Sequence, residues 1–299
     1  MLNSKLETFL ILCKLQNFSK TAEHLHITQP AVSQHIKFLE EYYSGKLFTY
    51  SGRKFSLTKR GQMLYNFTEA MFADSEHIRK ILSRGDFEAP SVSFGATKTI
   101  GEYVMPPLIA ALLARYPEAK VKMLVDNTEE LFLKMRDGEL DFLIIEGYFK
   151  KTDFCVELFS TEEFIGLCSP DSHLAQKSVS LEELTKERLI LRESGSGTRD
   201  IFSHLLSEYN MSTESFAGVC EISNMRAIKE LVAANMGITF MYRAAAEEEI
   251  KSGRMKIIDL PGITMKHEFN FVCTQNSVNS EEYFSRFNFF KDVRFANSN

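Results

Sequence analysis

Residues 27–43, ITQPAVSQHIKFLEEYY, form a pattern typical of one helix with two contrasting faces. Val32, Ile36 and Leu39 recur at steps of four and three, which predicts an apolar stripe packed against a core. The opposite face holds amides, a hydroxyl and one cation, contributed by Gln29, Pro30, Ser33, Gln34 and Lys37. A solvated face would carry more Glu–Lys pairs. We therefore interpret this face as a contact surface, the alternative being a core helix with an incidental polar side.

The residues before this helix predict two shorter helices and a tight turn. The first has an apolar stripe made of Leu6, Phe9, Leu10 and Cys13. Residues 17–29 predict the second, with Ser19 as its N-cap. Thr28 is a suitable N-cap for the third helix, and Pro30 lies in the first turn, where its missing N–H costs no hydrogen bond. This pattern indicates a helix-turn-helix, whose third helix would present its first residues to base edges in the major groove.

Residues 45–61, GKLFTYSGRKFSLTKRG, predict a short hairpin after the third helix. Leu47 and Phe48 would anchor it, and the turn would lie at residues 51–52. Arg53 and Lys54 would then lie at its tip, where cations can reach the minor groove or its phosphates. A solvated charged loop is the alternative.

Charge is unevenly distributed along the 299 residues. The whole chain has a formal net charge of −5, but residues 1–60 hold nine Lys or Arg against four Glu, a net charge of +5. The remainder therefore carries −10. An acidic body repels polyanions, so any contact with nucleic acid is expected in the first sixty residues.

Residues 18–61, FSKTAEHLHITQPAVSQHIKFLEEYYSGKLFTYSGRKFSLTKRG, resemble the winged helix-turn-helix of the LysR-type transcriptional regulators. That family carries A-A-x-x-L, S-Q-P-A-[LV]-S, L-E and L-F-x-R at this spacing. Here Thr28 stands in place of the usual Ser, and Tyr50 in place of the usual Arg, which removes one expected phosphate contact. The DNA-binding residues expected within residues 1–58 are Thr28, Gln29, Pro30, Ser33, Gln34, Lys37, Arg53 and Lys54.

Residues 59–88 are expected to connect this domain to the rest of the chain. Between Thr58 and Arg84 there is no Pro, and apolar residues recur in a heptad-like pattern, interrupted by Asp74. A helix of this length reaches roughly 40 Å and could pair two chains. The alternative is a long helix packed on its own chain. The residues expected to make a dimer contact are Leu64, Phe67, Met71, Ile78 and Ile81.

Residues 89–299 predict an α/β body of two subdomains. Short apolar segments alternate with amphipathic helices, which indicates parallel sheets built from βαβ units. We expect subdomain I at about 89–161 plus 265–299, and subdomain II at about 162–264. The expected strands are 91–97, 120–126, 140–147, 188–193, 217–223, 237–243 and 267–275, and the main helices are 103–116, 128–138, 199–209 and 225–236.

Ligands of such sheets bind beyond the carboxyl ends of strands, near helix N-termini. Four strand-to-helix junctions carry suitable chemistry, the best being RESGSGTRD at 192–200, where glycines allow close backbone approach. Helix capping alone is the alternative at each junction. The expected effector-binding residues are Thr97, Lys98, Thr99, Asn127, Thr128, Ser196, Gly197, Thr198 and Asn224.

The body also resembles the periplasmic-binding-protein-like effector domain of LysR-type regulators. The R-E-x-G-S-G-T-R pattern recurs in members that respond to small anionic metabolites or sulfur oxyanions. The resemblance implies an effector in a cleft between the subdomains, here an oxyanion or small carboxylate, and a homotetramer built as a dimer of dimers. Glu146 departs from a purely cationic site: if it lines the cleft, it disfavours dianions or binds a ligand amine.

These patterns predict a sequence-specific, effector-responsive transcriptional regulator in the cytoplasm, without cofactor, metal or catalytic residues. Its expected partners are double-stranded promoter DNA, a small-molecule effector, further copies of itself and, as an additional candidate, RNA polymerase. Ser196 superficially suggests a nucleophile, but ESGSGT does not match G-x-S-x-G, and no Walker or H-E-x-x-H motif is present. A ligand-independent DNA-binding dimer, whose body serves only for oligomerisation, is the alternative function.

The five cysteines show no C-x-x-C or metal-ligand spacing, which predicts reduced thiols. A redox pair such as Cys155 with Cys168 stays open at this stage.

Overall fold

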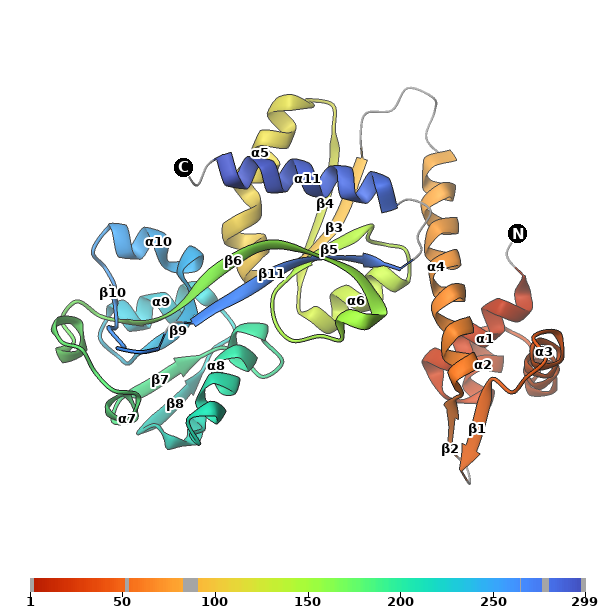
Figure 1. The fold of residues 1–299 in the computed structure, drawn as a ribbon, viewed down its shortest axis with the longest axis horizontal. Helices are drawn as coiled ribbons and strands as arrows, with labels where there is room; N and C mark the ends of the chain where they lie inside the picture. The colour runs from red at the N-terminus through yellow and green to blue at the C-terminus, as the bar shows by residue number, and fades with distance from the viewer. Residues whose placement is uncertain (1–2, 52–53, 83–90, 264, 276–279, 297–299) are drawn as a thin grey trace. The chain divides into compact units, whose positions relative to one another are not determined.

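The computed structural model describes residues 3–51, 54–82, 91–263, 265–275 and 280–296. These residues divide into two compact units (Figure 1). The first, here called the head unit, contains the elements up to α4, and the second, the body, contains those from β3 onward. Each unit has its own apolar core.

The head unit is a helix-turn-helix followed by a two-stranded hairpin. Asn17 caps the second helix by accepting a hydrogen bond from the backbone N–H of Lys20, so the expectation of Ser19 as the cap was wrong. Thr28 caps the third helix, accepting from the N–H of Ala31 at 3.3 Å. The elements are α1 (Ser4–Leu15), α2 (Phe18–His24), α3 (Gln29–Tyr42), β1 (Phe48–Ser51), β2 (Lys54–Leu57) and α4 (Lys59–Leu82).

The apolar stripe of α3 packs into the core of the head unit. Val32, Ile36 and Leu39 are each at most 4 % exposed, and they share one cluster with Phe9 of α1 and Phe48 of β1. The rings of Phe9 and Phe48 lie 5.6 Å apart between centroids. Burial of one face therefore fixes the rotation of α3 and turns its other face outward.

The residues expected to make a dimer contact lie on α4, some in the core of the head unit and others exposed. Leu64 is 8 % exposed and belongs to the core of the head unit, and Met71 packs against that core. Phe67 and Ile78 are 58 % and 41 % exposed. The Ile81 side chain lies outside the described residues. Little of Leu64 is therefore free for a partner, because its own chain covers it, whereas Phe67 and Ile78 present apolar surface.

The body is built on a mixed sheet rather than the purely parallel sheets expected from the sequence. β3 pairs in parallel with β4 and β5, but β11 runs antiparallel to β5, and β6 runs antiparallel to β9 and β10. The strand order is β10-β6-β11-β5-β3-β4. The first elements are β3 (Ser91–Thr97), η1 (Ile100–Val104), α5 (Met105–Arg115), β4 (Lys120–Asp126), α6 (Thr128–Arg136), β5 (Phe142–Ile145), η2 (Lys151–Asp153) and β6 (Phe154–Cys168).

Two long strands, β6 and β11, run through the body (Figure 1). The carboxyl-terminal half of β6 pairs with β9 and β10, and that of β11 pairs with β5, so these strands link two groups of elements. The later elements are η3 (His173–Gln176), α7 (Leu181–Leu184), β7 (Arg188–Leu191), α8 (Gly197–Glu208), η4 (Thr213–Ser215), β8 (Gly218–Glu221), α9 (Met225–Ala233), β9 (Thr239–Tyr242), α10 (Arg243–Lys251), β10 (Lys256–Ile257), β11 (Met265–Thr274) and α11 (Ser280–Ala296).

The cysteine pair left open by the sequence is excluded by the fold. Cys155 and Cys168 lie at opposite ends of β6. At a rise of about 3.3 Å per residue the strand separates them by roughly 40 Å, far beyond the reach of a disulfide. All five cysteines are free thiols.

Within the described ranges, no helix is long and apolar enough to cross a bilayer. Those ranges also contain no group of three or more His, Cys, Asp or Glu side chains arranged to hold a metal ion.

Aromatic rings stabilise the core of the body. Phe142 on β5 is fully buried, and its ring centroid lies 5.4 Å from that of Phe94 on β3 and 5.0 Å from that of Phe271 on β11. Phe287 of α11 covers Phe271 at 4.5 Å. These contacts pack the last helix against three neighbouring strands of the sheet.

We expect Phe142→Ala to lower the free energy of unfolding of the body by about 3–5 kcal/mol, because the cavity cannot close between paired strands. Urea unfolding followed by circular dichroism measures this loss. Leu133→Ala is the control: that side chain is 49 % exposed on α6, and its removal should change stability by about 0.5 kcal/mol or less. A loss below about 1 kcal/mol for Phe142→Ala would contradict its assigned place in the core.

Candidate functional sites

The polar face of α3 is presented to solvent along its whole length. All five of the residues expected on it are exposed, namely Gln29, Pro30, Ser33, Gln34 and Lys37, and so is the N-cap residue Thr28. The ammonium of Lys37 lies 3.8 Å from the Glu41 carboxylate, and both side chains are at least two-thirds exposed, so solvent screens this pair. The face is therefore free to hydrogen-bond with an external partner.

Glu40 ties the end of α3 to the start of the hairpin. Its carboxylate accepts from the backbone N–H of Leu47 at 3.0 Å and from the ammonium of Lys46 at 2.6 Å. At the other side of α3, the Nδ1 atom of His35 lies 2.8 Å from the Thr8 hydroxyl of α1. These contacts fix α3 between α1 and the hairpin. Glu40 is the Glu of the L-E pattern noted in the sequence, so that pattern has a structural role here.

The hairpin has the strand pairing expected of a wing. Ser51 pairs with Lys54, so Ser51 belongs to a strand rather than to the turn expected from the sequence. Tyr50 is 61 % exposed on β1. Lys54 begins β2, but its side chain is not among those described, and Arg53 lies outside the described residues.

A small polar pocket in the body is lined by residues at the ends of several strands. The pocket lies between the carboxyl ends of β3, β4 and β5 and the segment that joins β7 to α8. The lining residues are Thr97, Lys98, Asp126, Asn127, Thr128, Glu146, Arg192, Glu193, Gly195, Ser196 and Gly197. Strand ends and the N-terminus of α8 thus meet at one place, the arrangement in which open α/β sheets bind ligands.

Glu146 is the most deeply buried carboxyl group of this pocket. It follows β5, is 3 % exposed, and accepts a hydrogen bond from the Thr97 hydroxyl. Burial raises the pKa of Glu146 above its ordinary value, although the Thr97 hydrogen bond and the nearby Arg192 oppose this shift. Burial therefore favours the neutral form of this carboxyl group relative to that of an exposed glutamate.

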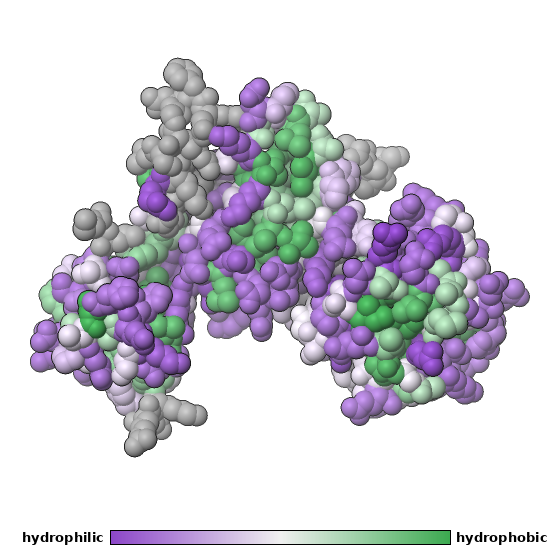
Figure 2. Space-filling view, turned by 180° about the vertical axis from the view of Figure 1, so that it is seen from behind, coloured by the Kyte–Doolittle hydropathy of each residue, from purple (hydrophilic) through white to green (hydrophobic). Residues whose placement is uncertain are grey.

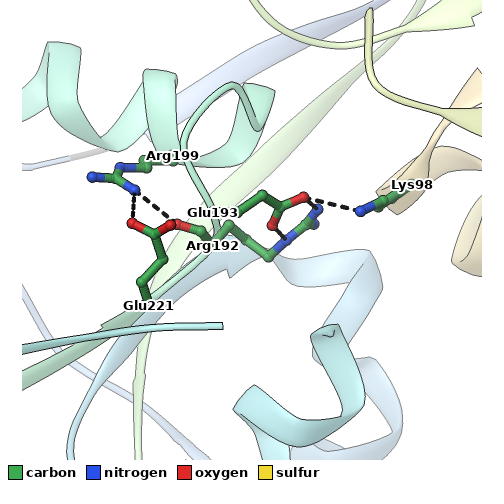
Figure 3. A network of polar contacts seen from close by, with 5 residues as sticks. All are labelled: Lys98, Arg192, Glu193, Arg199 and Glu221. Carbon is green, nitrogen blue, oxygen red and sulfur yellow. Dashed lines mark hydrogen bonds and ion pairs between the residues drawn. The ribbon is translucent and has the colours of Figure 1, made fainter. Parts of the chain in front are cut away.

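Glu193 gathers both cations of the pocket (Figure 3). Arg192 contacts it through two nitrogens at 2.7 and 2.9 Å, and the Lys98 ammonium lies 2.9 Å from the same carboxylate. Burial opposes ionisation, but the hydrogen bonds from Arg192 and Lys98 lower the pKa of Glu193 to about 2. Behind this group, Arg199 of α8 pairs with Glu221 at the end of β8. The cations of the site are thus largely neutralised by the protein itself.

Ser196 leaves a hydroxyl group uncommitted at the start of α8. Its side chain is 6 % exposed and lines the pocket, yet it makes no capping hydrogen bond and has no other partner in the described part of the chain. The preceding Gly195 has a φ of +81°, a conformation that glycine adopts without strain. A buried hydroxyl beside helix N–H groups is suited to an anionic oxygen.

The structure brings together six of the nine expected effector-binding residues, namely Thr97, Lys98, Asn127, Thr128, Ser196 and Gly197. Thr99 and Thr198 are buried outside the lining, and Asn224 is exposed and caps α9 by accepting from the N–H of Ala227. Sequence reasoning did not select Arg192, Glu193 or Asp126. The signal was present, because each directly follows or ends a strand, but polar capping residues were favoured over charged ones.

Two family comparisons cover nearly the whole chain. The bacterial regulatory helix-turn-helix protein, lysR family, matches residues 4–62, and the LysR substrate binding domain matches residues 85–291. The chain therefore belongs to the LysR family of transcriptional regulators, which confirms the resemblance and the fold class inferred from the sequence.

Curated relatives share this organisation. The HTH-type transcriptional regulator CysL of Bacillus subtilis is 30 % identical over 282 residues, covering 92 % of this chain and 93 % of the relative. A probable RuBisCO transcriptional regulator of Phaeodactylum tricornutum is 29 % identical over 278 residues, covering 90 % of each chain. Both relatives are named as regulators, and the expectation of a regulator rather than an enzyme is confirmed.

Solved structures show the same fold at lower identity. Full-length BenM has a TM-score of 0.60 at 17 % identity and covers 99 % of this chain and 97 % of its own. The Synechocystis CcmR regulatory domain, solved in complex with 2-PG, has a TM-score of 0.59 at 23 % identity and covers 66 % of this chain and 95 % of its own.

The ion group around Glu193 predicts an acid-sensitive contribution to stability. Because its pKa is about 2 in the folded chain and about 4.3 when unfolded, the stabilisation is complete above about pH 5 and is lost as the pH falls toward 2. Glu193→Gln should lower the free energy of unfolding of the body at neutral pH by about 1–2 kcal/mol, a figure that allows for solvent screening. It should also reduce the fall of that free energy between about pH 5 and 2, the acid limb of the stability curve. Urea unfolding at several pH values measures both, with the exposed Glu214→Gln as control. An unchanged acid limb would contradict the assigned ion group.

Proposed function

We propose that this regulator reads a dyad-symmetric promoter site through the exposed face of α3. The carrying observation is that Gln29, Ser33 and Gln34 are all exposed while the opposite face of the helix is buried. Gln can hydrogen-bond bidentately with adenine, and Ser reaches bases or phosphates. Lys37, with Arg53 and Lys54 on the wing, supplies charge for the phosphate backbone.

In the same proposal, the pocket at the start of α8 binds a small oxyanion or carboxylate that controls the regulator. The uncommitted Ser196 hydroxyl and the N-terminus of α8, which meet in a small pocket, support a ligand of few atoms. The 2-PG complex of the CcmR regulatory domain supports a small ligand in this domain class. The ligand must bind one arrangement of the protein more tightly than the other to change DNA binding.

The proposed working form is a homo-oligomer in the cytoplasm, a dimer or a dimer of dimers. Phe67 and Ile78 on α4 offer exposed apolar surface for one contact. The body carries exposed apolar residues such as Leu113 on α5 and Met236 after α9, and Figure 2 shows apolar groups on its rear face. Two recognition helices in one dimer would match two half-sites. Contact with RNA polymerase at the promoter completes the proposal.

Gln29→Ala should cost about 1–3 kcal/mol of discrimination at defined base pairs of each half-site, because the hydrogen bonds to one base are lost. Lys37→Ala is the matched comparison. It should weaken binding to specific and random DNA alike and reduce the slope of log affinity against log salt concentration by about one. Footprinting upstream of the protein's own gene, followed by titration with specific and random duplexes, measures both. Equal losses of Gln29→Ala on both duplexes would contradict base reading by this residue.

Ser196→Ala should weaken binding of the small anion about tenfold or more while leaving DNA binding without effector intact, because a hydrogen bond to a charged group contributes about 1.5–3 kcal/mol. Thermal-shift titrations with sulfate, phosphate, nitrate and small carboxylates measure the affinity. Ser207→Ala, near the other end of α8, is the control. A flat response of the unsubstituted protein to every anion would favour the ligand-independent DNA-binding dimer, whose body serves only for oligomerisation.

A further inference from the structure

The charge inventory of the pocket conflicts with simple anion binding. The cations Lys98 and Arg192 are both bonded to Glu193, so little positive charge is left unopposed. Asp126 adds a second carboxylate to the lining, and Glu146 adds a third at its buried end. An anion that enters this pocket therefore meets carboxyl groups as well as helix N–H groups.

Glu146 and the anion-binding groups border the same small space. Gly197, the first residue of α8, lies so close that a Cβ atom on it would be 3.4 Å from the Glu146 carbonyl oxygen and 3.6 Å from its Cγ atom. Ser196 lines the same cavity beside it. Because Ser196 and Glu146 line one small pocket, a ligand that reaches the Ser196 hydroxyl also lies close to the Glu146 carboxyl.

Two negative oxygens held side by side in a buried space repel each other strongly unless a proton lies between them. A carboxyl group suited to hold that proton is Glu146, whose side chain is 3 % exposed and accepts a hydrogen bond from the neutral hydroxyl of Thr97. Burial raises its pKa, in the direction that retains the proton. The other titratable groups that face it are Lys98, Asp126, Arg192, Glu193 and the buried phenol of Tyr242.

We propose that Glu146 and the bound anion share a single proton, so that this site accepts a fully deprotonated oxyanion only while Glu146 carries the proton itself. The inference rests on the proposed effector site and adds its selectivity: ligands able to supply their own proton remain bound at higher pH. Glu146 is thus a specificity-determining residue, and its role as counter-ion for a ligand amine is the opposing outcome.

The shared proton determines whether anion affinity rises or falls with pH. Sulfate holds no proton near neutral pH, so its affinity should fall up to tenfold for each pH unit above the pKa of Glu146 in the empty pocket. Phosphate retains a proton of its own around neutrality, so its affinity should fall less steeply. The preference for phosphate over sulfate therefore grows as the pH rises.

The test measures sulfate and phosphate affinity of the full chain by thermal shift and calorimetry at several values between about pH 5.5 and 9. Glu146→Gln, which keeps the shape of a neutral carboxyl group, should bind sulfate with no pH dependence. Glu208→Gln is the control, because this exposed carboxylate at the end of α8 lies outside the pocket lining; it should retain the wild-type slope. Calorimetry in two buffers of different ionisation enthalpy should show the unsubstituted protein taking up about one proton per sulfate at high pH, which tests the idea without any variant.

Three results would overturn the inference. Sulfate affinity independent of pH in the unsubstituted protein rejects the shared proton but leaves the anion pocket in place. Glycine binding more tightly than acetate, and more tightly at higher pH, makes Glu146 an ionised counter-ion for an amine. Absence of binding by sulfate, phosphate, acetate and glycine at every pH rejects the pocket itself, and with it the effector site proposed above.

Discussion

The candidate ligand pocket of this LysR-family regulator depends on van der Waals contact between the turn after β5, at Gly147, and the start of α8, at Gly197. A Cβ atom on Gly147, whose φ is +100°, would lie 3.5 Å from the Cα atom of Gly197. This approach places the first turn of α8 directly against the end of β5. The ion pair between Lys98 and Glu193 joins β3 to the segment before α8 at the same pocket, so backbone contact and charge act together.

That geometry gives the pocket a balanced rather than a cationic character. Glu193 neutralises Lys98 and Arg192, and a deeply buried Glu146 lines the same pocket. For the effector proposed above, selectivity would come from the placement of donors and protons more than from net attraction, because unpaired charges in a small buried space are costly. An effector that reorganises the Glu193 ion group would also alter the link between β3 and α8, which gives the site a route to conformational coupling.

In the head unit, packing and a few hydrogen bonds hold α3 with its polar face exposed. One face of α3 is buried with Phe9 and Phe48, and the opposite face is left polar and uncommitted. Glu40 fixes the hairpin to the end of that helix, so recognition helix and wing are held as neighbours. Rigid support beneath exposed amides is what base reading requires, since each hydrogen bond must meet a fixed position in the groove.

Local patterns in the sequence determined much of this protein: the stripe of α3, the Thr28 cap, the limits of β3 and β4, and six residues of the pocket all follow from neighbours within one or two helical turns. The tertiary structure alone decided the rest. Leu64 is covered by its own chain, Cys155 and Cys168 lie apart on one strand, and Glu146 becomes buried. Lys98 and Glu193 are ninety-five residues apart along the chain yet hydrogen-bonded in the fold. Sequence periodicity reports which face of an element is apolar, whereas the burial of a carboxyl group and the partner of a charge depend on elements brought together only by folding.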